Sequence, residues 1–350
     1  MSAPAPPYIS FVIAARNDAY AGGMLRRLQV CIDSFLHQAE ALAVPSELIL
    51  VDWNPPPGRS LWASLSWPHA LRSCSVRVIT VPPDLHAKHP FGNRLPIIIH
   101  LARNVGIRRA RGTFVLPTSA DILLSDHLVA TFGAQQLDAS DMYRIARHDV
   151  PDAVLAIDSH QARLRYCEQH VIQVHDRGRS YRLGDAPHLF TNGAGDFTLL
   201  SREMYVQLRG IPEEREFHSM HFDSVFCFQA YAAGARERIF VEPSRIYHVD
   251  HGVPSWRTRP SLLERLATRL PLKPKTSKRL VKRVRKLSPP RSAMDRRGVP
   301  YINLSSPEGK ARYEGLIRQI VAARGAFYYN DVDWGLGSYT FDEKGVGGSV

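Results

Sequence analysis

The sequence has no long apolar segment and few cysteines. Its longest apolar runs, such as residues 11–15, fall far short of the roughly 18–20 residues that a membrane-spanning helix needs. The first seven residues contain no basic region followed by an apolar stretch, so we expect no secretory signal and a cytoplasmic location. The cysteines form no C-x-x-C pair, which argues against a zinc ribbon and a disulfide framework. They are Cys31, Cys74, Cys167 and Cys227.

Several short motifs of common enzyme classes are also absent. The chain contains no Walker phosphate loop, no G-x-S-x-G nucleophile elbow, no G-x-G-x-x-G dinucleotide fingerprint and no internal repeat. It is nevertheless long enough for a sizeable core, because 44% of its 350 residues are hydrophobic. That length fits either two domains or one large α/β domain with an appendage.

The net charge of +12 is concentrated in one segment. Residues 257–297 hold fifteen Lys or Arg against Glu264 and Asp295, so the rest of the chain is close to neutral. Prolines divide this segment into two predicted amphipathic pieces, 262–270 and 278–287. We expect it to lie against an anionic membrane surface, which would place the protein peripherally on the membrane, or against an anionic acceptor; the alternative is a solvated linker. Nucleic acid is a poorer fit, because only Trp256 offers a stacking ring nearby.

In the first third of the chain, short β-rich runs alternate with helical patterns. This order predicts an α/β fold with a mostly parallel sheet flanked by helices. Past residue 135 the pattern loosens, and the polar stretch at 157–188 shows no clear element. The predicted strands are 8–14, 47–51, 76–81, 113–116, 142–146, 197–200, 238–241 and 245–248, and the predicted helices are 21–43, 97–111, 202–208, 221–233 and 308–324.

Acidic residues follow three of the predicted strands. Asp18 comes after the first strand, Asp52 closes the second and Asp121 follows the fourth. An open α/β sheet binds ligands beyond the carboxyl ends of its strands, so these side chains are candidate ligand contacts. A carboxylate there can accept from a base N–H or a ribose hydroxyl, or hold a divalent cation. Asp18 and Asp52 could equally cap the following helix or turn.

Three segments in this order resemble the nucleotide-sugar half of a family 2 glycosyltransferase with the GT-A fold: YISFVIAARND, SELILVDWNPP and LARNVGIRRARGTFVLPTSADILLS. The later segments GDF at 195–197, GIPE at 210–213 and HFD at 221–223 are similar to the acceptor half of these enzymes. The resemblance implies a GT-A domain over 1–252, with a nucleotide-sugar half at 1–130 and an acceptor half at 131–252. A basic segment at 253–300 and a C-terminal helix and tail at 301–350 would extend it.

The resemblance further implies an inverting glycosyltransferase. It would move a sugar from a nucleotide diphosphate donor, with UDP favoured, to a hydroxyl of a glycan or lipid-linked acceptor. Arg94 is a candidate diphosphate contact because it lies near the start of a predicted helix, and Lys88 is its alternative. The other implied donor-binding residues are Asn17, Asp18, Asp52, Asn104, Ser119 and Asp121. Asn192 and Asp196 would contact the acceptor, although the glycines beside them could simply mark a tight turn.

One departure from the family concerns its Asp-X-Asp metal motif. Ser119 stands in place of the first aspartate, and Asp121 is retained. By resemblance, Asp121 and a late histidine, His248 or its rival His251, would hold Mn²⁺ or Mg²⁺. Since a diphosphate and waters can supply further oxygen ligands, weak or substrate-dependent metal binding is expected, and metal independence is the alternative.

Sugar transfer to a hydroxyl also needs a base. The candidate is Asp223, at the start of a predicted helix, where an ordinary N-cap is the competing interpretation. Asp196 and Glu213 are the rivals. Two other functions stay open: a sugar-nucleotide nucleotidyltransferase and a non-enzymatic protein that binds an anionic polymer. The first is disfavoured because residues 15–18 lack the glycine-rich loop that such enzymes typically place after the first strand.

Overall fold

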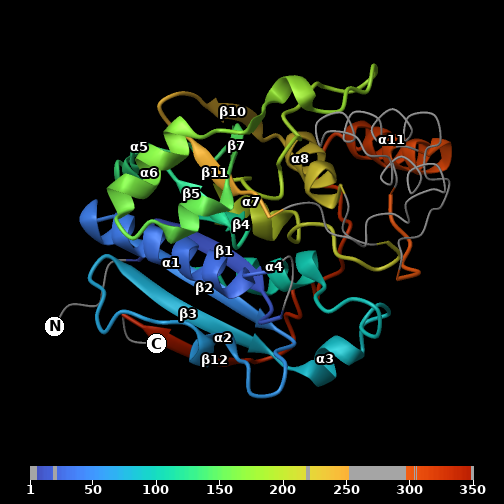
Figure 1. The fold of residues 1–350 in the computed structure, drawn as a ribbon. Coiled ribbons are helices and arrows are strands. Elements are labelled where there is room, and N and C mark those ends of the chain that lie inside the picture. Colours follow the sequence, from blue (N-terminus) through green and yellow to red (C-terminus); the bar gives the residue numbers. More distant parts are fainter. Residues whose placement is uncertain are drawn as a thin grey trace, which may run out of the picture.

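The central sheet has four parallel strands and an antiparallel strand at each edge. In the computed structural model, which describes residues 6–18, 22–217, 221–251, 297–302, 304 and 306–347, the strand order is β12-β3-β2-β1-β4-β9 (Figure 1). The parallel strands are β1 (Ile9–Ala15), β2 (Ser46–Trp53), β3 (Cys74–Val81) and β4 (Phe114–Thr118), and the edge strands are β12 (Asp342–Val346) and β9 (Leu200–Ser201). The predicted mostly parallel α/β sheet is confirmed.

Helices cover both faces of this sheet because alternate residues of its buried strands point to opposite sides. Val12 and Val51 pack in a core with α4 (Ile99–Arg108), α7 (Arg202–Gln207) and α8 (Phe222–Ala232). Phe11 and Leu50 pack in a second core with α1 (Met24–Ala41) and α5 (Asp126–Gly133). The remaining short helices are α2 (Leu61–Ser64), α3 (Pro83–Ala87), α6 (His160–Gln169) and the 3₁₀ turns η1 (Asp152–Ala156) and η2 (Arg177–Arg179).

Helix α4 lies unusually close to the sheet at Gly106. A Cβ atom on this residue would lie 2.5 Å from Cγ1 of Val12 in β1, which is inside van der Waals contact. The glycine of the R-N-x-G segment therefore lets helix and strand pack against each other.

A second sheet begins where the first one ends. Its strand order is β5-β11-β7-β8, and β5 follows β4 after only residues 119–121. β11 runs antiparallel to β5 and parallel to β7, so it brings residues 246–249 to the carboxyl end of β4. The strands are β5 (Ile122–Leu124), β11 (Ile246–Val249), β7 (Arg147–Val150) and β8 (Gln173–His175), and β10 (Arg236–Phe240) pairs separately with β6 (Asp141–Ile145).

The polar stretch at 157–188 is more ordered than the sequence predicts. It contains α6, β8 and η2. Leu164 and Cys167 of α6 are buried against Tyr247 and Val249 of β11, but they are among the few apolar residues of the helix. Two buried apolar positions give too weak a periodic pattern to be recognised from sequence.

The C-terminal residues complete the same core. α11 (Pro307–Ala322) lies beside α8 at one end of the molecule, and β12 lies beside β3 at the edge of the sheet (Figure 1). Between them, Trp334 is buried, and Arg108 and Arg109 of α4 donate hydrogen bonds to five backbone carbonyls of residues 332–339. The tail predicted as an extension thus packs as part of the main body. Residues 253–296 of the predicted basic segment, with both amphipathic pieces, lie outside the described residues.

No helix in the described part of the chain combines the length and the hydropathy required to cross a bilayer. All four cysteines are free and buried.

Candidate active site

The carboxyl end of β2 carries a buried acid with one unused oxygen. Asp52 Oδ2 accepts a 2.7 Å hydrogen bond from the Leu61 N–H at the start of α2. Its Oδ1 is buried and has no hydrogen-bond partner among the described residues. Burial raises the pKa of Asp52 to about 6, against the lowering effects of the Leu61 N–H and the Arg16 charge. An unpaired buried oxygen of this kind suits a donor group of a ligand.

The loop after β1 lies beside this acid. β1 and β2 pair so that Ala15 is opposite Asp52, two residues before Asn17. Asn17 Nδ2 donates a 2.9 Å hydrogen bond to Ser64 Oγ, and Asp18 forms a 3.0 Å ion pair with Arg16. The structure therefore brings three predicted donor-binding residues, Asn17, Asp18 and Asp52, to one edge of the sheet.

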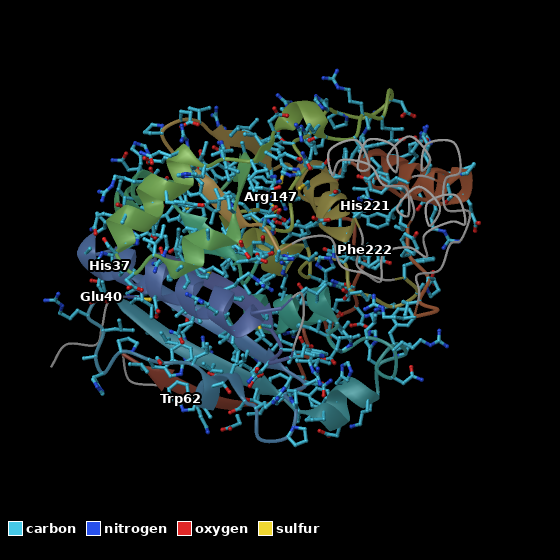
Figure 2. The ribbon with its side chains drawn as sticks, viewed as in Figure 1. His37, Glu40, Trp62, Arg147, His221 and Phe222 are labelled. Carbon is cyan, nitrogen blue, oxygen red and sulfur yellow. The ribbon has the colours of Figure 1, made fainter. Side chains whose placement is uncertain are left out.

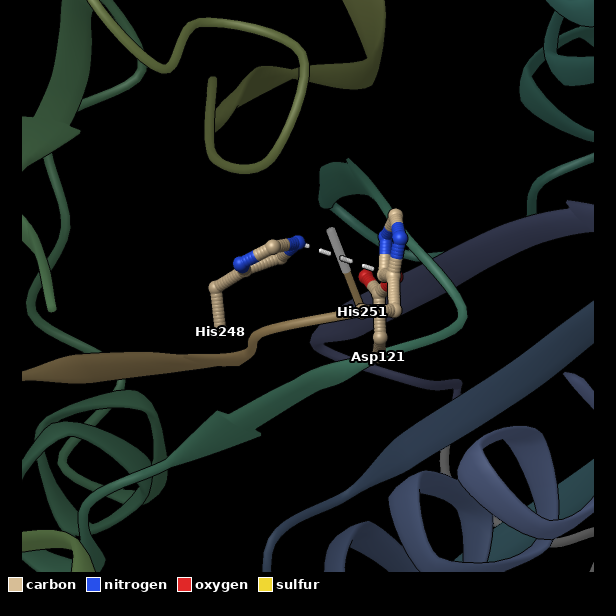
Figure 3. Close-up of side chains that lie close together, drawn as sticks. All are labelled: Asp121, His248 and His251. Atoms are coloured by element: carbon tan, nitrogen blue, oxygen red, sulfur yellow. Dashed lines mark ion pairs between the residues drawn. The ribbon is translucent and has the colours of Figure 1, made fainter. Parts of the chain in front are cut away.

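Asp121, His248 and His251 form a compact group at the end of β4. Asp121 lies in the turn before β5, and the pairing of β11 with β5 places His248 opposite Ile122. Nε2 of His251 lies 3.0 Å from Asp121 Oδ2, and Nε2 of His248 lies 3.7 Å from the same oxygen, so all three groups face one point (Figure 3). His248 and His251, which the sequence offers as alternatives, both lie beside Asp121.

The donor atoms of this group fit a divalent metal ion. One ligand atom from each residue lies within 4.8 Å of the others. Metal–ligand bonds of about 2.0–2.2 Å place neighbouring ligands roughly 3 Å apart or slightly more, which the separations of 3.0 and 3.7 Å from Asp121 Oδ2 approach. The other Asp121 oxygen, Oδ1, is buried and has no hydrogen-bond partner in the described part of the chain. Two imidazoles and one carboxylate suit Mn²⁺ better than Mg²⁺, since Mg²⁺ prefers oxygen ligands.

Three further residues of the second sheet lie next to this group, and the sequence patterns identified none of them as site residues. They are Arg147, Asp149 and His175. Arg147 forms ion pairs of 2.7 Å with Asp196 and 3.0 Å with Asp149. Asp149 in turn lies 2.9 Å from His175 Nε2 and 3.2 Å from His248 Nδ1. Arg147 and Asp149 are two residues apart on β7, so their side chains share a face. A strand predicted over 147–150 would have indicated that these two residues lie together. Figure 2 shows Arg147 near the centre of the view, with His221 and Phe222 at the start of α8.

The ionisation states in this cluster favour a bound cation. Burial alone would raise the pKa of Asp149, but contacts with His248, Arg147 and His175 outweigh it and hold the pKa at about 2. For Asp196, burial is likewise outweighed by the charges of Arg147 and His248, so its pKa is lowered. Burial lowers the pKa of His248, but the carboxylates of Asp149, Asp121 and Asp196 outweigh it, so the pKa of His248 is raised. The same carboxylates that favour a positive charge on this ring would favour a divalent cation in its place.

Asp196 contacts the end of β4 and the turn that carries Asp121. Ser119 Oγ donates a 2.7 Å hydrogen bond to Asp196 Oδ1, and Thr118 Oγ1 donates to the Asp196 carbonyl at 2.8 Å. Arg103 of α4 donates a 3.1 Å bond to Ser119 Oγ. The structure thus places Asp196 against Ser119, which lies two residues before Asp121 in the chain.

Asp223 lies near Arg103, the residue that donates a hydrogen bond to Ser119. It occupies the first turn of α8, whose N-cap is His221, so the N-cap interpretation does not hold. Its Oδ1 accepts a 3.0 Å hydrogen bond from the Ser224 N–H. A Cβ atom built on Gly195 would lie 3.0 Å from Asp223 Oδ2 and 3.4 Å from Arg103 Nη1. The carboxylate of Asp223 and the guanidinium of Arg103 therefore flank Gly195.

The hydrogen bonds of three other predicted residues do not reach this cluster. Asn104 is fully buried and bonds to the backbone of Ile211 through both Nδ2 and Oδ1, at 2.7 and 2.9 Å, which gives it a structural role. Arg94 is exposed and donates to the Gly298 carbonyl at 2.7 Å. Asn192 Nδ2 donates to the Asp176 carbonyl at 3.4 Å. Donor or acceptor contacts by these side chains stay predictions.

Glu213, a rival base, is also held by the protein. It is buried, and its Oε1 accepts bonds from Asn104 Nδ2 at 2.9 Å and from the Gly335 N–H at 2.7 Å. Burial raises its pKa to about 7. These contacts join the G-x-P-E segment to α4 and to the C-terminal tail.

Comparisons with known proteins give distant structural likenesses. No protein-family model matches the chain, and no curated protein matches its sequence. Residues 1–349 of S. aureus TarS in complex with UDP align with a TM-score of 0.44 and 12% identity, over 93% of this chain and 94% of that one. Against the longer TarS structure the TM-score is 0.43 at 13% identity, and the alignment spans 44% of that chain. GalNAc-T7 with UDP, GalNAc and Mn²⁺ aligns with a TM-score of 0.41 and 13% identity, over 70% of this chain and 44% of that one. Likenesses this distant assign no activity.

Proposed function

We propose that this protein is an inverting glycosyltransferase of the GT-A type that transfers a sugar from a nucleotide diphosphate donor to a hydroxyl group. One observation carries the proposal: two features lie at strand ends on the same edge of the parallel sheet. They are Asp52 with its unpaired oxygen, and the group of Asp121, His248 and His251. Uridine as the nucleoside, and a glycan or lipid-linked molecule as the acceptor, follow from the family resemblance alone.

Different residues of the chain would bind the nucleoside and the metal ion. Asp52, with Asn17 and Asp18 beside it, would hold the nucleoside. Asp121, His248 and His251 would hold a divalent ion, with Mn²⁺ favoured, and the bound ion would offset the charge that develops on the leaving diphosphate.

Asp223 would act as the general base. One of its oxygens bonds to the Ser224 N–H, whereas Oδ2 faces Gly195 and Arg103. The rivals are more fully engaged: Asp196 bonds through both oxygens to Ser119 and Arg147, and Glu213 bonds to Asn104 and the tail. An acceptor hydroxyl that loses its proton to Asp223 and attacks the anomeric carbon in line, opposite the diphosphate, would invert that carbon.

Nucleotide calorimetry tests the donor site. UDP and GDP are titrated with and without Mn²⁺ into the wild type and into Asp52→Ala, which removes both carboxylate oxygens. We expect UDP to bind the wild type and to bind Asp52→Ala more weakly, while the variant stays folded. Unchanged affinity in Asp52→Ala would place the nucleoside elsewhere.

Asp223→Asn tests the base. The amide keeps the side-chain size and can still accept the Ser224 N–H bond, so the fold is preserved. Turnover, measured as hydrolysis of UDP-sugars with water as the acceptor, should fall about 10²- to 10⁴-fold at unchanged UDP affinity. Near wild-type turnover would contradict the assignment and redirect it to Asp196 or Glu213.

The basic segment is proposed to bind an anionic membrane surface. Its fifteen cations over 257–297 against two acids supply the charge for such binding. Sedimentation with liposomes containing acidic lipid should pellet the full chain, and a variant with six of these cations neutralised should pellet less. Equal pelleting of the two proteins would rule out this role.

A further inference from the structure

His248 lies between two carboxylates. Its Nδ1 is 3.2 Å from Asp149 Oδ1, a close ion-pair contact in which neither atom makes a hydrogen bond among the described residues, and its Nε2 is 3.7 Å from Asp121 Oδ2. The two contacts come from the two neighbours of β11, since His248 is paired with Asp149 on β7 and with Ile122, next to Asp121, on β5. The pairing of the strands thus places the His248 ring between the two acids.

From this arrangement we infer that Asp149 is a positioning residue: it holds the His248 ring as the Nδ1–H tautomer and so presents the Nε2 lone pair to a metal ion shared with Asp121 and His251. The inference rests on the proposed metal site and extends it to a residue that does not itself face the metal position.

The physical reason lies in the two nitrogens of a neutral imidazole. One of them carries a hydrogen and the other carries a lone pair, and the partner of the first decides which is which. A carboxylate opposite Nδ1 accepts its hydrogen, which leaves Nε2 free to bind a cation. Carboxylates placed in this way behind metal-binding histidines fix the ring orientation and raise the basicity of the ligand.

Asp149 is suited to this role because it is itself held in place. Arg147 Nε lies 3.0 Å from Asp149 Oδ1, and His175 Nε2 lies 2.9 Å from Oδ2. Its side chain is 16% exposed, so these charges are only weakly screened by solvent. The carboxylate therefore has little freedom to turn away from His248.

The first test measures the tautomer of His248 without any metal. Nitrogen-15 NMR of the imidazoles in the metal-free full-length protein, at a pH where His248 is neutral, distinguishes Nδ1–H from Nε2–H, and a His248→Ala sample assigns the signal. We expect the Nδ1–H form in the wild type and a mixed or Nε2–H form in Asp149→Asn, which keeps the size but loses the charge. An Nε2–H form in the wild type would overturn the inference, even if Asp149→Asn failed to fold.

The second test measures Mn²⁺ affinity from the electron paramagnetic resonance signal of the free ion. Asp149→Asn should bind Mn²⁺ about 10- to 100-fold more weakly than the wild type. The matched control is Asp152→Asn, the same change at an exposed position of η1. Its affinity should stay within about twofold of the wild type, because this carboxylate lies outside the cluster around His248.

The outcomes separate this inference from the proposed function. Equal Mn²⁺ affinity of wild type and folded Asp149→Asn refutes the role of Asp149 and leaves the metal site standing. A wild type that binds no Mn²⁺ refutes the metal site, and with it the purpose assigned to Asp149.

Discussion

Ser119 and Asp196, 77 residues apart in the chain, are joined by a 2.7 Å hydrogen bond from Ser119 Oγ to Asp196 Oδ1. The other oxygen of Asp196 is bound to Arg147 at 2.7 Å. The turn that leads to Asp121 contains a single acid of its own, yet a second carboxylate lies against it. The charge around this turn is therefore set partly by the distant loop that carries Asp196.

Replacing Ser119 by aspartate tests this relationship. In Ser119→Asp, two carboxylates would meet where a hydroxyl now donates to one. The repulsion should cost about 1–3 kcal/mol of unfolding free energy without metal, and Mn²⁺ should raise the Tm by more than it does in the wild type. Thermal unfolding with and without Mn²⁺ measures both effects. Ser119→Ala, which removes the bonds without adding charge, is the control, and identical behaviour of the two variants would contradict the prediction.

Glu213 should make stability depend on pH. Burial raises its pKa from the ordinary 4.5 to about 7, so between these values the folded protein holds a proton that the unfolded chain releases. The free energy of unfolding contributed by this group therefore falls as the pH rises from about 4.5 to 7. A shift of this size corresponds to roughly 3 kcal/mol.

In Glu213→Gln the amide oxygen can still accept from Asn104 and Gly335, but no charge is buried. We expect the variant to exceed the wild type in stability by up to about 3 kcal/mol at pH 8, and the gap to close near pH 4.5. Urea denaturation at both pH values measures it, with the exposed Glu168→Gln as the control. A gap that did not change with pH would show that Glu213 is not shifted.

The sequence predicts the central sheet well because its strands are local and nearly uniformly apolar. Residues such as Val12 and Leu50 are completely buried, and continuous apolar runs of this length indicate buried parallel strands. The acids at the strand ends follow directly, so Asp52 and Asp121 could be singled out without a structure.

The second sheet and the edge strand β12 could not be predicted in the same way. β12 has the sequence DEKGV and pairs with β3, more than 250 residues earlier, so neither composition nor local periodicity indicates it. Arg147 and Asp149 lie on a four-residue strand with two charged side chains, and they become site residues only when β11 pairs beside it. Asn104 lies in a motif that suggests donor binding, but the hydrogen bonds of its side chain to the Ile211 backbone could not be predicted from that motif.

The edge strand should contribute to stability through Arg77. This buried guanidinium contacts Glu47 at 3.1 Å and Glu343 of β12 at 3.0 Å. Glu343→Gln removes one of its two charge partners and should cost about 1–2 kcal/mol, more than an exposed pair would. Urea denaturation measures the loss. Glu242→Gln, which breaks the exposed contact with Arg245, is the matched control and should cost under about 1 kcal/mol; equal losses would show that β12 is held by its backbone bonds alone.

A side chain at Gly195 should slow turnover because it would meet the proposed base. The Cβ of Gly195→Ala would lie 3.0 Å from Asp223 Oδ2, nearer than ordinary van der Waals contact, so the carboxylate must move. The backbone at Gly195 is not left-handed, so alanine causes no strain of its own. A contact of this length displaces the carboxylate by a few tenths of an ångström, less than the shift of about 1 Å that can cost roughly 10²-fold in rate. We therefore expect hydrolysis of UDP-sugars to slow about 3- to 10-fold while UDP affinity stays within about twofold. Gly184→Ala is the control, since its Cβ would meet nothing within 4 Å. If Gly195→Ala turned over as fast as Gly184→Ala, the Asp223 carboxylate would not occupy this position when the sugar is transferred.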